Sequence, residues 1–432
     1  MILKIFLLFC TLSAICAKVS YENYKVYNVV PISEEQVQML TDLKKDFDFW
    51  TDVIDLEKNV RIMVAPDKEQ EFEEYMTSVG LIDLVGTIIK EINQINMNFI
   101  SLGSFEWTTY QTLDTIHAWL DELAEMYPDV VTTVNMGYSN ERRSLKGVII
   151  DFKPGQRGDR PLTAMIEGGI HAREWISPAT VTWIIKEFLT SDDPRVRMLA
   201  ESFVWHILPV TNPDGYVYTW EENRMWRKNR NTAHFGNCSS NNDLSNGIDL
   251  NRNFDYLWMT TGASLDPCAE TFAGPIPASE PETKAIENYV LTLNRTSEVI
   301  YYFAFHSFSQ MILIPYSHVG GEQVLEAENY AIRGAEKLTQ KHGTPYTVGT
   351  STDILYAVSG SSFDWVKGVA NVPIVFLFEL RDVGEFGFLL PAEQIIPNNE
   401  EIIECLIEMD TVYFHISIEP CSNFLYSQRD VK

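Results

Sequence analysis

After residue 104 the chain alternates short, continuously apolar segments with longer segments whose apolar residues recur at helical spacing. Strands that are apolar throughout are buried on both faces, which is typical of parallel sheets covered by helices. We therefore predict an α/β domain with a mixed, mostly parallel twisted sheet and helices on both faces. The expected strands are Lys146–Phe152, Pro161–Ile166, Phe203–Pro209, Val299–Phe305 and Pro373–Phe378, and the expected helices are Leu113–Met126, Ser177–Leu189, Glu322–His342 and Asn398–Ile416.

The segment from Tyr24 to Gly86 has a different pattern, in the order strand, helix, strand, strand, helix, strand. That order is typical of the ferredoxin-like unit, an α+β domain with two helices on one face of an antiparallel sheet. A connecting helix is expected over Thr87–Met97, and a large second domain begins near Ser104. The expected elements of the small domain are Tyr24–Val30, Glu34–Lys45, Phe47–Ile54, Asn59–Val64, Lys68–Ser78 and Leu81–Val85.

Residues 1–17 have the pattern of a secretory signal peptide, because Lys4 precedes an apolar run that ends in small residues near Ala17. The rival interpretation, a buried core helix, does not explain why the pattern starts at Met1. No later segment is long and apolar enough to cross a membrane. We therefore expect a secreted, extracellular protein without a membrane partner.

Two of the six cysteines lie in the predicted signal peptide, which leaves four, and an even number in an oxidising compartment favours two disulfides. The simplest pairing joins neighbours in the sequence, although three pairings are formally possible. The spacings do not resemble a structural zinc site. The expected pairs are Cys238–Cys268 and Cys405–Cys421.

The formal net charge of −27 makes nucleic acid a poor partner for this chain. Proteins that bind phosphate backbones need a basic face that releases counterions, and this composition does not provide one. We interpret the acidity as a source of solubility and expect a monomer that does not bind nucleic acid.

His171 and Glu174 follow a predicted strand and the glycine pair Gly168-Gly169. Glycines allow a sharp turn there, so the two side chains can point at one metal ion from a loop rather than from a helix. A His and a Glu at this spacing are weak evidence alone, and a surface or core histidine is the commoner alternative. A third ligand must come from elsewhere in the chain.

Two other polar residues end apolar strands at the positions where open α/β sheets build their sites. His306 ends the strand Val299–Phe305, and Glu379 ends the strand Pro373–Phe378. Together with His171 and Glu174, His306 completes two imidazoles and one carboxylate, a ligand set that leaves a catalytic zinc ion one open position for water. Glu379 is then the candidate general base.

Several motifs, in the same order along nearly the whole chain, resemble those of the zinc metallocarboxypeptidases of the digestive A/B type in proenzyme form, most closely carboxypeptidase A. The resemblance implies a carboxypeptidase-like fold, one Zn²⁺ per chain and hydrolysis of the C-terminal peptide bond. The motifs are His171-Ala-Arg-Glu174-Trp, Thr211-Asn-Pro-Asp-Gly215, Asn223 to Arg230, Asp249-Leu-Asn251-Arg252-Asn253, His306-Ser-Phe-Ser-Gln310, Tyr356 with Ser359 to Trp365, and Phe378-Glu379-Leu-Arg381-Asp382 running into Gly387 to Pro391.

The resemblance also implies a role for each matched residue. His171, Glu174 and His306 would bind zinc, Glu379 would activate water, and Arg227 would stabilise the oxyanion. A guanidinium keeps its charge and carries a fixed fork of donors, which suits it to carboxylates and developing negative charge. The residues implied in substrate binding are Asn251 and Arg252 as the clamp for the terminal carboxylate, Tyr356 as its cover, and Arg173 and Arg224 as outer contacts.

The same resemblance places Phe363 at the position that is acidic in family members that release basic residues. The matched neighbours Leu313, Leu355 and Leu377 are also apolar. A Lys or Arg side chain would have no counter-charge in this pocket, and an unpaired buried ion costs several kcal/mol. We therefore expect a preference for aromatic or aliphatic C-terminal residues, with bulky Phe363 able to narrow the pocket.

In this interpretation residues 18–103 are the propeptide, with the ferredoxin-like domain and its connecting helix, and residues 104–432 are the catalytic domain. Family proenzymes are often opened after a basic residue near the junction, but the chain has no Lys or Arg between Lys90 and Arg142. A trypsin-like protease could cut only at Lys90 or upstream and would leave an extended amino terminus, unless another protease cuts near Asn98–Ser104. The expected partners are peptides or proteins with a free C-terminus, an activating protease and proteinaceous carboxypeptidase inhibitors.

Three other functions remain as alternatives. A non-catalytic binding protein on the same scaffold would lack a ligand, the base or the arginine, and none is missing here. A processing carboxypeptidase that acts on a few secreted peptides differs from a digestive one only in its substrates. A metal-free storage protein predicts no bound zinc, so metal analysis separates it from the enzyme.

Overall fold

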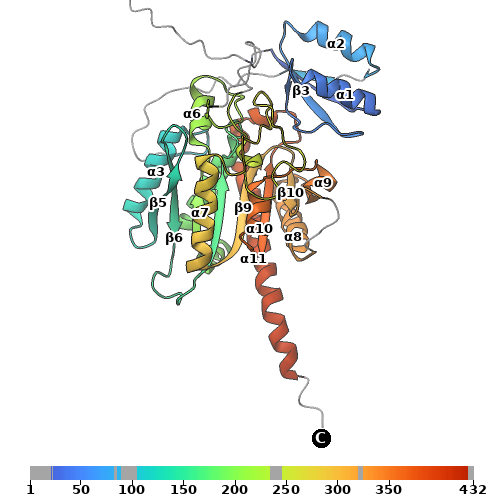
Figure 1. Ribbon diagram of the computed structural model, residues 1–432. Helices are drawn as coiled ribbons and strands as arrows, with labels where there is room; N and C mark the ends of the chain where they lie inside the picture. Colours follow the sequence, from blue (N-terminus) through green and yellow to red (C-terminus); the bar gives the residue numbers. More distant parts are fainter. Residues whose placement is uncertain are drawn as a thin grey trace, which may run out of the picture.

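The computed structural model describes residue 21 and residues 23–81, 85–88, 105–233, 246–319 and 325–426, with the backbone alone at 85–88, 325–326 and 414–426. A small domain with two helices stands beside a larger α/β domain (Figure 1). The predicted signal peptide and most of the predicted connecting helix lie outside the described residues. The start of that helix is wrong, because Thr87 and Ile88 belong to a strand.

The small domain has the predicted ferredoxin-like order. It contains β1 (Lys25–Val29), α1 (Glu34–Leu43), β2 (Asp48–Phe49), β3 (Val60–Val64), α2 (Glu69–Ser78) and β4 (Val85–Ile88). The strands form an antiparallel sheet in the order β2-β3-β1-β4. β2 is much shorter than the strand expected over Phe47–Ile54, so Asp52 lies in the loop after it.

The large domain is built on an eight-stranded sheet in the order β11-β10-β12-β9-β7-β8-β6-β5. The central neighbours β12, β9, β7 and β8 run parallel, and the edges add antiparallel pairs, so the predicted mixed sheet is confirmed. The strands are β5 (Val131–Tyr138), β6 (Ser144–Ile150), β7 (Leu162–Gly168), β8 (Val204–Leu208), β9 (Glu298–Ser307), β10 (Met311–Ile314), β11 (Thr347–Thr350) and β12 (Ile374–Leu380).

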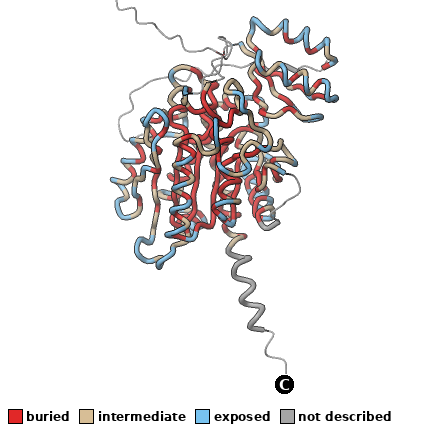
Figure 2. The backbone as a smooth tube through the Cα atoms, in the orientation of Figure 1, coloured by how far each residue is buried: buried red, intermediate tan, exposed pale blue. Residues whose placement is uncertain are grey.

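Helices cover both faces of this sheet, and each face packs its own apolar core (Figures 1 and 2). α3, α4, α5, α8 and α11 pack on one face, and α7 and α10 pack on the other. Within the described residues, no helix is long and apolar enough to cross a membrane. The helices are α3 (Leu113–Met126), α4 (Ile176–Thr190), α5 (Pro194–Ser202), α6 (Pro213–Glu221), α7 (Pro281–Thr296), α8 (Leu325–His342), α9 (Ser351–Ile354), α10 (Ser362–Gly368) and α11 (Ile395–Tyr426).

The expected bridge between Cys405 and Cys421 is wrong. Cys405 is a free, buried thiol on α11. Both residues belong to that one helix, where their spacing corresponds to roughly 24 Å of rise, far beyond the ~7 Å between Cα atoms that a disulfide tolerates. Cys268 does take part in a disulfide. Its predicted partner Cys238 lies outside the described residues.

The parallel centre of the sheet brings three strand ends to one edge. In the β-sheet register, Gly168 at the end of β7 pairs with Phe305 of β9, and His306 pairs with Glu379 of β12. Residues that follow or end these strands therefore meet at one place, although they are far apart in the sequence. This edge carries the candidate site.

Candidate functional site

The turn after β7 brings His171 and Glu174 to the edge of the sheet. Gly169 has φ +63°, a left-handed conformation that suits glycine. A Cβ atom at Gly168 would lie 2.8 Å from Val181 Cγ2 and 2.9 Å from Ser177 Oγ, so α4 packs closely against this turn. Ser177 Oγ accepts a hydrogen bond from Gly169 N at 2.9 Å. The predicted loop geometry is confirmed.

Three potential metal ligands converge in this turn. His171 Nδ1 lies 2.8 Å from Glu174 Oε1 and 3.2 Å from His306 Nδ1, and His306 Nδ1 lies 3.2 Å from Glu174 Oε2. All three side chains are buried, and their ligand atoms lie within 4.8 Å of one another. Two imidazole nitrogens and a carboxylate at this separation fit a single zinc ion with an open position.

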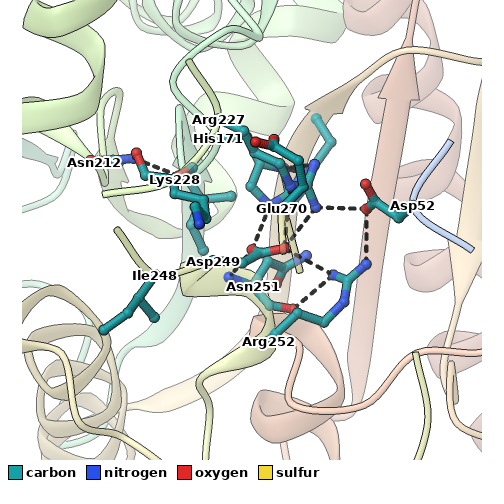
Figure 3. A network of polar contacts seen from close by, with 12 residues as sticks. Asp52, His171, Asn212, Arg227, Lys228, Ile248, Asp249, Asn251, Arg252 and Glu270 are labelled. Atoms are coloured by element: carbon teal, nitrogen blue, oxygen red, sulfur yellow. Dashed lines mark hydrogen bonds and ion pairs between the residues drawn. The ribbon is translucent and has the colours of Figure 1, made fainter. Parts of the chain in front are cut away.

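Asp249 fixes the orientation of His171, a role that the sequence did not predict although Asp249 stands in a matched motif. Its Oδ1 lies 3.1 Å from His171 Nε2 (Figure 3). A carboxylate there places the imidazole proton on Nε2 and leaves the Nδ1 lone pair for a metal, as in carboxylate–histidine–zinc arrangements. Burial opposes ionisation of Asp249, but Arg227 and Arg252 outweigh it and hold its pKa well below the usual range.

Glu379 lies beside the metal ligands on β12. It pairs in register with His306 of β9 and Met311 of β10. Burial and the nearby Glu174 carboxylate raise the pKa of Glu379 well above its ordinary value, while Arg227 opposes the shift. A divalent cation held by the neighbouring ligands would oppose it further. The position suits a group that accepts and returns protons.

Arg227 is buried between the metal ligands and the clamp residues. Its NH2 nitrogen donates to Asp249 Oδ2 at 2.9 Å, and its NH1 nitrogen lies 3.9 Å from Glu174 Oε1. A guanidinium held by two carboxylates is fixed in place and keeps its charge. It can therefore act on negative charge that develops next to the metal ligands.

Asn251 and Arg252 lie in the short 3₁₀ segment Leu250–Arg252, directly after Asp249. Arg252 Nε donates to the carbonyl of Gly262 at 2.9 Å, which orients its guanidinium toward the site. Asn251 Oδ1 accepts from Ser362 N at 2.9 Å. The structure thus brings both predicted clamp residues together beside Arg227 (Figure 3).

A carboxylate of the small domain occupies this clamp. Asp52 Oδ2 accepts hydrogen bonds from Arg227 NH2 at 2.7 Å, Arg252 NH2 at 3.0 Å and the Tyr356 hydroxyl at 3.1 Å. Figure 3 shows Asp52 reaching the two arginines from outside the large domain. Burial alone would raise the pKa of Asp52, but the two arginines outweigh it and lower the pKa. Sequence reasoning missed Asp52, because one aspartate in a predicted strand carries no signal.

Of the two arginines predicted as outer contacts, Arg173 is buried next to the small domain and Arg224 is half-buried. Arg173 lies 3.5 Å from Glu270 Oε2 and 4.0 Å from Asp48 Oδ1 of the small domain. Arg224 donates to the carbonyls of Arg173 at 2.7 Å and Phe388 at 2.6 Å. In this form Arg224 supports the backbone of the site, and contact with a substrate stays a prediction for both arginines.

The residues predicted to form the specificity pocket share one apolar cluster. Leu313, Phe363 and Leu377 are buried in it, and Leu355 packs against it half-buried. Phe363 lies on α10, directly after Ser362, whose backbone N–H bonds to Asn251. The apolar cluster is thereby attached to Asn251, and its role as the specificity pocket stays a prediction.

Comparison with known proteins assigns the large domain to a zinc carboxypeptidase family and the small domain to its activation peptide, in agreement with the sequence motifs. The family described as "Zinc carboxypeptidase" matches residues 116–404, and the family described as "Carboxypeptidase activation peptide" matches residues 27–82. The chain is 38% identical over 401 residues to zinc carboxypeptidase A 1 of Anopheles gambiae, covering 90% of this chain and 89% of that one. It is 39% identical over 303 residues to carboxypeptidase B of Astacus astacus, covering 69% and 95%.

Solved structures agree with this. The crystal structure of thrombin activatable fibrinolysis inhibitor (TAFI) matches with a TM-score of 0.79 and 29% identity, over 90% of this chain and 98% of that one. The bovine protein, solved in complex with tick carboxypeptidase inhibitor, matches with a TM-score of 0.64 and 33% identity, over 72% and 99%. The likeness therefore extends to both sequence and fold.

Proposed function

Because this chain belongs to the zinc carboxypeptidase family and carries that family's activation peptide, we propose that it is a secreted zymogen with an aromatic or aliphatic preference. Residues 1–17 are the signal peptide, 18–103 the propeptide and 104–432 the catalytic domain. The observation that carries the proposal is the Asp52 carboxylate, which binds Arg227, Arg252 and Tyr356 next to the metal ligands. A site that binds one propeptide carboxylate this way is suited to the C-terminal carboxylate of a peptide.

In the active form, the terminal carboxylate of the substrate takes the place of Asp52. Arg252 and Asn251 bind it, and Tyr356 closes over it. Charge pairing with a chain terminus makes the enzyme an exopeptidase, because an internal peptide bond offers no anion to this clamp.

The scissile carbonyl then lies between Arg227 and the metal ligands. His171, Glu174 and His306 would hold zinc, which would supply Lewis acidity toward a water molecule and the carbonyl. Arg227 stabilises the negative charge on the carbonyl oxygen. Glu379 takes a proton from the attacking water and delivers it to the leaving amine.

The preference for aromatic or aliphatic residues rests on the pocket. Leu313, Phe363 and Leu377 are buried in one apolar cluster. A basic side chain entering this cluster would lose its hydration without gaining a counter-charge from these residues. The names of the relatives do not decide the preference, since both a carboxypeptidase A and a carboxypeptidase B match the chain.

Secretion rests on the pattern of residues 1–17 and on the disulfide of Cys268, because disulfides persist in oxidising compartments. The chain acts as a monomer. An activating protease removes the propeptide, and proteinaceous carboxypeptidase inhibitors bind the exposed site. The matched bovine protein, which was solved in complex with a tick carboxypeptidase inhibitor, supports the second partner.

The test is an activity profile of the full chain before and after removal of the propeptide. Peptides that differ only in a C-terminal Phe, Leu, Lys or Arg are compared, with and without a chelator. We expect activity only after processing, loss of activity with the chelator, and faster release of Phe or Leu. Faster release of Lys would contradict the proposed preference, and chelator-resistant cleavage would contradict the zinc mechanism.

A further inference from the structure

Glu167 is a buried carboxyl group whose position near the site needs an explanation. It lies on β7, four residues before His171 in the sequence, and is 1% exposed. Its strand neighbours on the same face, Met165 and the β9 residue Tyr302, belong to the apolar cluster that also contains Phe363. Burial raises the pKa of Glu167 to about 7, with Ser362 and Tyr302 opposing the shift. Burying a carboxyl group in apolar surroundings costs free energy of folding unless the group is hydrogen-bonded, so its presence here suggests a role.

The hydrogen-bond partner of Glu167 belongs to the substrate site. Ser362 Oγ donates to Glu167 Oε1 at 2.5 Å, and Ser362 N donates to Asn251 Oδ1 at 2.9 Å. The hydroxyl of Ser362 is thus fixed by Glu167, and its backbone N–H in turn fixes the side chain of Asn251. All three side chains are buried, so solvent does not compete for these bonds.

The bond from Ser362 also decides which way the Asn251 carboxamide faces. Because Oδ1 accepts from a backbone N–H, only the Nδ2 hydrogens remain to bind another acceptor. In the described part of the chain, Nδ2 donates to no protein acceptor. Two free donor hydrogens beside Arg252 suit a carboxylate ligand.

The backbone just before Ser362 packs directly against the backbone of Arg252, so a shift of Ser362 also displaces Arg252. Gly360 has φ +74°, and a Cβ atom there would lie 2.2 Å from the carbonyl oxygen of Arg252. Phe254 N donates to the Gly360 carbonyl at 3.0 Å. Close backbone contact leaves little room for either segment to shift alone.

We propose that Glu167 is a positioning residue that, through Ser362, fixes Asn251 in the orientation that binds the substrate carboxylate and fixes Phe363 in the pocket. This role rests on the proposed clamp of Asn251 and Arg252. Glu167 does not touch the substrate. Its loss lets Ser362 change rotamer and weakens the restraint on Asn251, so substrate binding is affected more than the chemical step.

The test uses the processed enzyme and one peptide with C-terminal Leu. We compare Glu167→Met, which removes the acceptor, with Glu167→Gln, which keeps a carbonyl oxygen for Ser362, and with Ser362→Ala. We expect KM to rise about tenfold in Glu167→Met and Ser362→Ala, the size of one lost hydrogen bond, with kcat changed less than about threefold. Glu167→Gln should restore KM to within about twofold of the original. Equal loss in Glu167→Gln and Glu167→Met, or a fall in kcat alone, overturns the proposal.

A matched control separates positioning from general stability. Asp410 on α11 is another buried carboxyl group, and burial raises its pKa to about 7 as well. Asp410→Leu should alter thermal stability while KM stays within about twofold of the original, because the residue has no link to the clamp. If Glu167→Met does not fold, Ser362→Ala still decides the question.

Two further variants distinguish failure of this inference from failure of the proposed clamp. Arg252→Ala must raise KM strongly if the clamp is correct, whatever Glu167 does. If KM rises in Arg252→Ala but not in the Glu167→Met and Ser362→Ala variants, only the positioning role is wrong. On an Asn251→Ala background, Glu167→Met should have little further effect on KM, because the residue through which it acts is gone.

Discussion

Asp52 Oδ2 of the propeptide lies 2.7 Å from the NH2 nitrogen of Arg227, although 175 residues separate the two in the chain. The same oxygen also accepts from Arg252 and Tyr356. If the proposed clamp is correct, this propeptide carboxylate takes the donors that a substrate terminus would need, and the proenzyme cannot bind a substrate until Asp52 leaves.

Replacing Asp52 should weaken this block. Asp52→Ala leaves Arg227 and Arg252 buried without a shared anion, and loss of one partner of a buried charge pair costs about 3–5 kcal/mol. We expect the intact proenzyme to gain activity on small peptides, on the order of tenfold or more, and to be processed faster. Chromogenic peptide hydrolysis by the uncleaved chain measures this. Asp42→Ala, at an exposed position of α1, is the control and should change neither quantity.

Replacing Asp249 should weaken zinc binding without removing a ligand. Asp249→Asn keeps the size of the side chain but no longer fixes the tautomer of His171, and such changes cost about 10- to 100-fold in metal affinity. Competition with a chromogenic chelator measures the zinc dissociation constant. The matched control is Asp214→Asn, since Asp214 also pairs with an arginine, Arg143, but has no contact with a metal ligand. Unchanged zinc affinity in Asp249→Asn would exclude the orienting role.

Docking of the propeptide should weaken as the pH rises from about 4 to about 7. Burial raises the pKa of Asp48 from 3.8 to about 7; Arg173 opposes this shift and Glu270 adds to it. The docked state favours the protonated form of Asp48. The stabilising effect of Asp48 on docking is therefore complete at a pH below its ordinary pKa of 3.8 and is lost as the pH rises to about 7. Above that value the loss is constant.

The measurement for Asp48 is hydrogen exchange of the propeptide helices in the intact proenzyme between about pH 5 and pH 8. In the original chain we expect protection to fall about tenfold over this pH range, less than the full pKa shift would give because the structure relaxes around the charged carboxylate. Asp48→Asn, compared with the original chain at each pH, should remove most of this pH dependence. Asp46→Asn, at an exposed position, should leave it intact. Protection that rises with pH in the original chain would contradict the predicted sign.

Placing a charge in the pocket should change its preference. Phe363→Asp supplies a buried counter-charge, so release of C-terminal Lys or Arg should rise relative to Leu by on the order of 100-fold in the ratio of kcat/KM values. Phe363→Asn has a similar shape without the charge and is the matched control. If both variants show the same ratio, enlargement of the pocket rather than charge sets the preference.

Local patterns in the sequence were sufficient to predict the fold class and the metal ligands, whereas the role of Glu379 as the general base stays a prediction. Continuously apolar strands predict a parallel sheet, and His306 and Glu379 lie at the ends of two such strands. The short strands β10 and β11 and the edge strand β5 were not predicted, because four residues or a half-exposed face give too little pattern. The helix α11 was predicted, but the bridge assumed between its two cysteines was not possible on one helix.

The tertiary structure alone decided which distant side chains meet. Asp249 beside His171, Glu167 beside Ser362 and Asp52 inside the arginine clamp are all polar contacts between segments that share no local pattern. The side-chain period of a strand or helix specifies which face is buried, and it therefore determines the layers. The partner of a single buried carboxylate depends instead on strand register and domain docking, which emerge only when the whole chain is packed.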